Sequence, residues 1–221
     1  MLRLRVLGAA LVALMALGIM ASSAMAALPE ALGTFPIKIE ATSGGGEGEL
    51  STLGGGISIK CKANTVTGEI TGAKTGKADV HFTGCTALGI FAANSLGDSS
   101  GTVLTGLLPF ELCYTNEAKK ELGIIIKEAN AHIEVPSVGA LINVTGSIIG
   151  TIGPLTKTKT LKVNFEPKSA GDQALVECFV SKVAKKASLL ASKDEKHKEN
   201  ESAAIKQSAE IKLAAEVQLD D

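Results

Sequence analysis

Apolar residues alternate with polar ones along most of the chain after residue 26, and this period of two is the feature that most limits its fold. In a strand, successive side chains point to opposite faces, so the alternation predicts strands with one buried face. Gly, Asn, Ser and Pro, residues typical of turns, separate the runs. The clearest runs are Phe35–Ile39, Ile57–Cys61, Ala78–Phe82, Leu108–Leu112, Ile124–Ile126, Ile133–Val135, Ile142–Val144, Leu161–Phe165 and Ala187–Ala191.

The final segment favours a helix by composition alone, because residues 208–219 are rich in Ala, Glu and Lys. Its apolar residues nevertheless fall on every second position from Ile211 to Leu219, which fits a strand better than a helix of 3.6-residue period. We therefore predict a closing strand. Ten or more short strands with closely spaced turns indicate one all-β domain over residues 27–221, an antiparallel β-sandwich or barrel.

The first 26 residues have the parts of a secretory signal peptide. Arg3 and Arg5 precede an apolar stretch from Val6 to Met20, and Ala24-Met25-Ala26 supplies small side chains for cleavage after Ala26. The apolar stretch is shorter than the ~20 residues that span a bilayer. We expect a helical signal peptide over residues 1–26, a product secreted or held at the cell envelope, and no membrane span after cleavage.

Removal of this segment changes the composition of the chain. All Arg and Met residues lie within it, so the 22 basic residues fall to 20 Lys against 23 acidic residues, a formal charge of −3, and there is no Trp. This balance excludes a strongly basic nucleic-acid binder. Without Arg or Trp, specific recognition of phosphate and stacking on sugars or bases are both disfavoured.

The four cysteines, Cys61, Cys85, Cys113 and Cys178, form an even set in a chain that we expect to leave the reducing cytosol. Two disulfides are the expected result. Spacings of 24, 28 and 65 residues lack the close pairs of a zinc site. Three pairings are possible. We favour Cys61 with Cys85 and Cys113 with Cys178, because the first pair brackets two consecutive predicted strands.

The segment Gly97-Asp98-Ser99-Ser100-Gly101 fits the G-x-S-x-G pattern around the nucleophile of serine hydrolases. An α/β-hydrolase needs a helix directly after the serine, whereas residues 102–106 have the composition of a strand or turn. A chymotrypsin-like order needs an Asp between His and Ser, and none lies between His81 and Asp98. Because a triad is defined by geometry, His132 or His197 could still approach Ser99.

Two short pairs of polar residues are candidate metal ligands. Asp79 and His81 share the polar face of one predicted strand, and His132 and Glu134 share that of another. The two pairs could hold a metal ion if the fold joined them. Exposed positions of alternating strands account for all four residues without a metal, so we expect neither a metal nor a cofactor.

Several segments together resemble a family of exported, β-rich, uncharacterised proteins of high-GC Gram-positive bacteria. They are residues 24–30 around the cleavage site, Val66 to Gly72, Phe82-Thr83-Gly84-Cys85, His132-Ile133-Glu134-Val135-Pro136 and the terminal strands from Ala187 onward. The resemblance implies export, β structure and paired cysteines, and it supplies no catalytic residues.

These observations favour a non-enzymatic binding or structural module that acts outside the membrane on an extracellular or cell-envelope partner. The alternative is a secreted serine hydrolase that uses Ser99. The sequence leaves open the ligand, the oligomeric state and the choice between sandwich and barrel.

Overall fold

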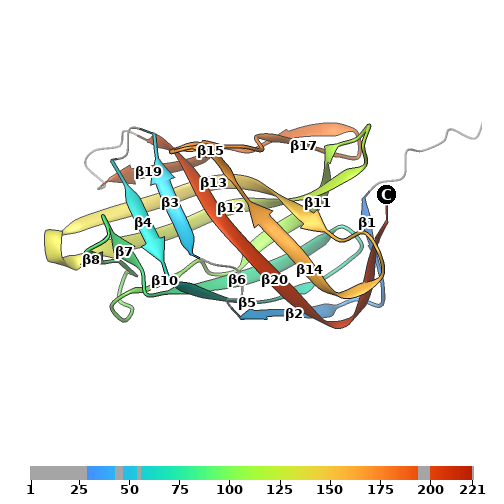
Figure 1. The fold of residues 1–221 in the computed structure, drawn as a ribbon, viewed down its shortest axis with the longest axis horizontal. Coiled ribbons are helices and arrows are strands. Elements are labelled where there is room, and N and C mark those ends of the chain that lie inside the picture. Colours follow the sequence, from blue (N-terminus) through green and yellow to red (C-terminus); the bar gives the residue numbers. More distant parts are fainter. Residues whose placement is uncertain (1–28, 43–46, 54–55, 194–199, 221) are drawn as a thin grey trace, which may run out of the picture.

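Antiparallel strands make up most of the computed structural model, which describes residues 29–42, 47–53, 56–193 and 200–220 (Figure 1). One turn of 3₁₀ helix, η1 (Pro136–Val138), is the only helical element in these ranges. No helix among the described residues is long and apolar enough to cross a membrane. The predicted all-β class is confirmed, and the predicted signal peptide, residues 1–26, lies outside the described residues.

Among the described residues, eighteen strands belong to one sheet, and β15 and β16 form a separate pair. In chain order the strands are β1 (Glu30–Leu32), β2 (Ile37–Thr42), β3 (Gly48–Thr52), β4 (Ser58–Cys61), β5 (Ala63–Ile70), β6 (Thr75–Thr83), β7 (Thr86–Ala87), β8 (Phe91–Ala92), β9 (Asn94–Ser95), β10 (Thr102–Leu104), β11 (Leu108–Asn116), β12 (Glu121–Val135), β13 (Ala140–Gly153), β14 (Thr158–Phe165), β15 (Pro167–Ser169), β16 (Asp172–Gln173), β17 (Glu177–Val180), β18 (Val183–Lys186), β19 (Leu189–Lys193) and β20 (Glu201–Asp220).

Eight of these strands pair in a closed ring. The order is β2, β5, β6, β11, β12, β13, β14, β20 and back to β2, with every neighbour antiparallel. The closing contact pairs Ile39 with Leu213 and Glu40 with Lys212. Because the ring closes, each of its strands has hydrogen-bonded neighbours on both sides, and one face of every strand is turned inward.

The alternation of the sequence decides which side chains point inward. In β2, Ile37 and Ile39 are buried while Lys38 and Glu40 are exposed. Full burial of one such aliphatic side chain stabilises the fold by about 1.5–3 kcal/mol. A register slip of one residue would expose the apolar row and bury the charges, so the alternation fixes the register.

The prediction of short strands was wrong for β12, β13 and β20, which have 15, 14 and 20 residues. The runs Ile124–Ile126 and Ile133–Val135 belong to one strand of 15 residues. The register against β13 shifts between Ile126 and Ala129, where Glu128 has a φ of 57°. This bulge moves the inward row from even-numbered to odd-numbered residues. A broken alternation therefore marks a bulge in a continuous strand here, where the sequence suggested a turn.

The ring is extended at the end that carries η1. There β19 lies between β13 and β20, and β3 and β4 continue the sheet beyond β20. Figure 1 shows β1 and the C-terminal end of β20 at the opposite end of the molecule. The β17–β18 hairpin packs on the outer side of β11, β12 and β13 through a small second core of Cys113, Ile125, Ile149, Cys178 and Val180.

Candidate functional site

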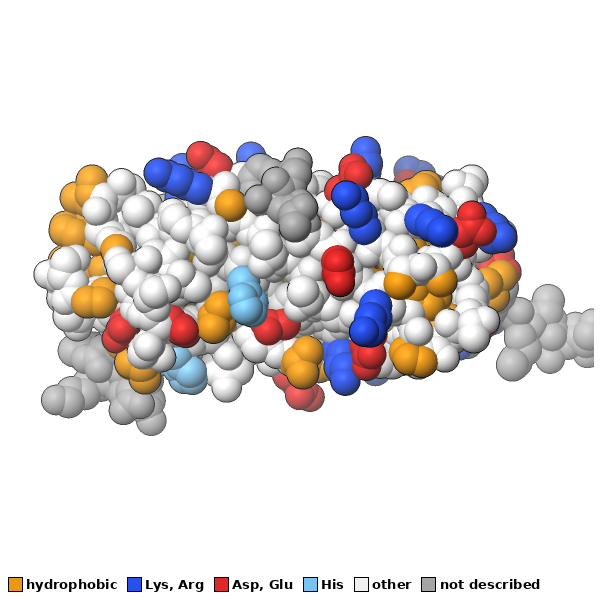
Figure 2. Space-filling model, turned by 90° about the horizontal axis from the view of Figure 1, so that it is seen from below, with side chains coloured by type: hydrophobic (Ala, Val, Ile, Leu, Met, Phe, Trp, Pro, Cys, Tyr) orange, Lys and Arg blue, Asp and Glu red, His pale blue; other side chains and the backbone are white. Residues whose placement is uncertain are grey.

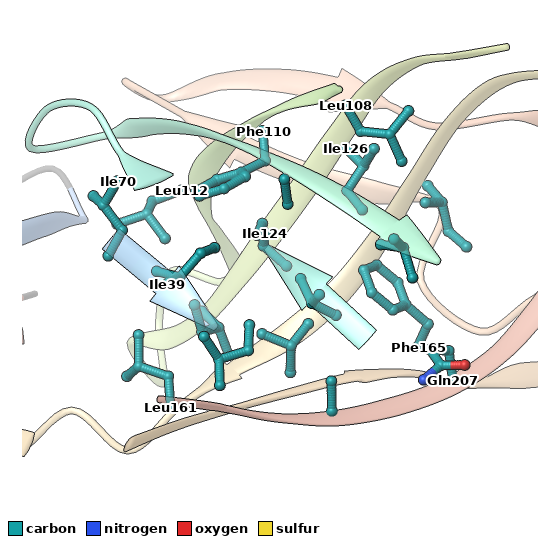
Figure 3. Close-up of a pocket in the computed structure, with 18 of the residues that line it drawn as sticks. Ile39, Ile70, Leu108, Phe110, Leu112, Ile124, Ile126, Leu161, Phe165 and Gln207 are labelled. Carbon is teal, nitrogen blue, oxygen red and sulfur yellow. The ribbon is translucent and has the colours of Figure 1, made fainter. Parts of the chain in front are cut away.

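A cavity of about 140 Å³, here called the main cavity, lies inside the ring. All eight ring strands contribute to its wall, and nearly all of the wall consists of aliphatic and aromatic side chains (Figure 3). An engineered cavity of about 150 Å³ with a similar lining stays dry and binds benzene. The labelled wall residues are Ile39, Ile70, Leu108, Phe110, Leu112, Ile124, Ile126, Leu161, Phe165 and Gln207.

A second cavity of about 100 Å³ adjoins the main cavity toward the η1 end. Phe82, Thr105, Leu108 and Ile205 line both cavities and therefore form the boundary that the two spaces share. Within β12, the bulge divides the two cavity walls. The β12 residues before the bulge line the main cavity, and those from Ala129 onward line the second cavity.

Two ionisable side chains reach the described cavity walls, and both are paired. Lys74, at the edge of the main cavity, lies 3.1 Å from the carboxylate of Glu30. Glu49, in the second cavity, lies 3.7 Å from the ammonium group of Lys60. Neither residue therefore presents an unpaired charge to its cavity. A wall of this kind favours an apolar ligand over an ion.

Charges otherwise gather on the outside of the molecule. Figure 2 shows Lys and acidic side chains intermingled on one face. Lys77 lies 3.1 Å from Glu69, and Lys157 lies 3.0 Å from Glu216. The hydrogen bond from Lys157, helped by its positive charge, lowers the pKa of the Glu216 carboxyl. These exposed pairs contribute to solubility and leave the interior to apolar groups.

One buried amide stands out in the wall of the main cavity. Gln207 is only 8% exposed, and its Oε1 atom has no hydrogen-bond partner among the described residues. The Nε2 atom donates to the Ser208 carbonyl at 2.9 Å. The hydroxyl of Thr105, by contrast, accepts from the Val80 amide and donates to the Gly106 carbonyl, at 3.0 Å each.

The structure joins the cysteines as the sequence predicts, Cys61 to Cys85 and Cys113 to Cys178. Cys61 lies in the wall of the second cavity, so the first disulfide anchors β4 beside that space. The second disulfide ties β17 to β11 and holds the outer hairpin against the ring. Both crosslinks therefore support the walls without entering the main cavity.

Ser99 lies in an exposed turn between β9 and β10. Its hydroxyl is 3.0 Å from that of Thr102, and the segment that follows is strand β10. Among the described residues, no hydrogen bond joins Ser99 to His81 or His132. His197 lies outside the described residues, so the third candidate base is not placed.

The candidate metal ligands bond within their own neighbourhoods. His81 lies 3.2 Å from Asp79. Glu134 accepts a hydrogen bond of 2.7 Å from Asn94, and His132 bonds to Asn143 on the neighbouring strand. In the part of the chain that the structure describes, no group of three or more potential ligands could hold a metal ion.

Sequence reasoning missed the cavity and Gln207. The signal for Gln207 was present, because the inward row of β20 runs Ala203, Ile205, Gln207, Ala209 and Ile211. A single amide in an otherwise apolar row of a closing strand marks a polar group directed inward.

Comparison with protein-family models, with curated proteins and with solved structures found no match, so the resemblance to an exported family stays a prediction.

Proposed function

We propose that this protein is an exported binding module whose ring of strands acts as a barrel around a small apolar ligand. The observation that carries the proposal is the main cavity of about 140 Å³, walled by apolar side chains from all eight ring strands. Apolar interiors are normally packed to crystal density, so a space of this size is unusual unless a ligand fills it.

The wall chemistry favours binding over catalysis. No Ser, Cys or His among the described residues lines the main cavity, and its lysine is paired with Glu30. The hydroxyls of the two threonines in the wall, Thr75 and Thr105, are hydrogen-bonded within the protein, so neither is held by a neighbouring base as an activated nucleophile would be. Ser99, the candidate nucleophile of the alternative function, is not among them.

The predicted route to the cell exterior agrees with this role. The pattern over residues 1–26 favours export, and the two disulfides suit an oxidising environment. Apolar molecules dissolve poorly in water, and a protein that encloses them would allow them to be carried or held outside the membrane. We expect the ligand to come from the envelope or the medium.

Titration of the folded, oxidised protein with ethylbenzene tests the proposal, because this molecule is close in size to the cavity. Ala209 lies in the main wall and Ala184 is exposed on β18, so Ala209→Leu fills the cavity while Ala184→Leu makes the same change outside. We expect the natural chain and Ala184→Leu to bind equally. Ala209→Leu should bind at least roughly tenfold more weakly. Absence of binding by the natural chain would refute the proposal.

A further inference from the structure

Gln207 occupies a position where the rest of the inward row is apolar. Its neighbours in that row, Ile205 and Ala209, also line the main cavity. A buried acceptor without a partner destabilises a fold by about 1–3 kcal/mol, and an aliphatic residue here would avoid that cost. An amide at this site therefore calls for a partner that the described residues do not supply.

The orientation of the amide group follows from its one hydrogen bond. Nε2 donates to the Ser208 carbonyl at 2.9 Å. A flipped amide would place Oε1 against that carbonyl oxygen, two acceptors facing each other. The unpartnered atom is thus the carbonyl oxygen, an atom that can only accept a hydrogen bond.

This oxygen lies beside residues that line the two cavities. The position that a Cβ atom of Gly48 would take is 2.6 Å from Gln207 Oε1 and 3.0 Å from Phe82 Cε1. Gly48 lines the second cavity, and Phe82 lines both. The oxygen and the edge of the aromatic ring therefore lie close together beside Gly48. The Phe82 ring is only partly buried, and a ligand hydroxyl could reach the buried oxygen only if this ring moved.

We infer that the ligand is an apolar molecule with one hydroxyl group, an alcohol, and that the hydroxyl donates to Gln207 Oε1. This inference rests on the proposed function. A pure hydrocarbon would leave the oxygen unpartnered, and a carboxylate would place a second acceptor against it. A neutral alcohol meets both the apolar wall and the single acceptor.

Benzyl alcohol and ethylbenzene differ by one OH in place of one CH3, so they isolate the hydroxyl. We would measure the dissociation constants of both for the natural chain and for Gln207→Met, which keeps the length of the side chain. A net hydrogen bond is worth about 0.5–1.5 kcal/mol, so the preference for benzyl alcohol over ethylbenzene should fall roughly two- to tenfold in Gln207→Met.

Two further variants separate this role from a structural one. Gly48→Ala forces the amide oxygen to move, since a Cβ would lie 2.6 Å from it, and should reduce the same preference while the amide remains. Gln173→Met makes the same chemical change outside both cavities, where Gln173 bonds to the Ile205 backbone at 2.9 and 3.2 Å. It should lower stability and leave the preference unchanged.

The outcomes distinguish the two proposals. If the natural chain binds neither compound, the proposed function fails. If ethylbenzene binds but Gln207→Met shows the same preference for benzyl alcohol over ethylbenzene as the natural chain, the apolar site is supported and the inference of an alcohol ligand is refuted. The same result is expected if a buried water is the true partner of Oε1. A preference lost in Gln207→Met and Gly48→Ala but kept in Gln173→Met is the result that we expect.

Discussion

Replacement of Ala209 by Leu tests whether the main cavity is space that a hydrophobic group can fill. Residual cavities cost about 24 cal/mol per Å³, so an empty volume of about 140 Å³ costs on the order of 3 kcal/mol. The substitution adds three carbon atoms, worth at most about 2.4 kcal/mol at ~0.8 kcal/mol per buried CH2 group. Ordering the longer side chain offsets about 0.5–1 kcal/mol. The net expectation is a stabilisation of about 1.5 kcal/mol.

The assay is urea unfolding of the oxidised protein, with the midpoint and slope fitted together. Ala184→Leu, on the exposed strand β18, should change the free energy of unfolding by less than about 0.5 kcal/mol. In a fully packed interior, the Ala209→Leu change would overpack the core and destabilise it by about 1–3 kcal/mol. A loss of stability in that range would refute the cavity.

Three other predictions concern export, crosslinking and the alternative function. N-terminal sequencing of the exported protein should find Ala27 as the first residue, and an intact Met1 product embedded in the membrane would contradict the localisation. Replacing Cys113 and Cys178 by Ala removes a crosslink between residues 65 apart and should lower the free energy of unfolding by about 4 kcal/mol, measured in urea; an unchanged midpoint would contradict it. A fluorophosphonate probe should leave Ser99 unlabelled, whereas labelling that disappears in Ser99→Ala would favour the hydrolase.

The alternation of apolar and polar residues was enough to predict the all-β fold class, because this alternation reflects only the local geometry of a strand. The inward row of β2 and the strict alternation over residues 211–219 both correspond to strands in the structure. The ring itself could not be predicted, since closure depends on the pairing of Ile39 with Leu213, residues far apart in the chain. In a sandwich and in a barrel alike, every second side chain of a strand faces the core, so the two folds have the same pattern of apolar and polar residues.

The candidate site depended even more on long-range contacts. A cavity results from the combined volumes of side chains on eight strands, and no local pattern reports that sum. Gln207 was missed because the predicted strand began at residue 208, whereas β20 begins at Glu201. The bulge at Glu128 similarly divided one strand into two in the sequence pattern.

The most direct test of the central claim is methyl NMR of the folded protein with ethylbenzene, because three consecutive residues of β12 supply both probe and control. Ile124 and Ile126 line the main cavity, whereas Ile125 is 3% exposed and packs in the outer core. The account predicts ligand-to-methyl nuclear Overhauser effects at Ile124 and Ile126 and none at Ile125. Effects at Ile125 instead, or at none of the three with saturating ligand, would contradict an apolar binding site inside the ring.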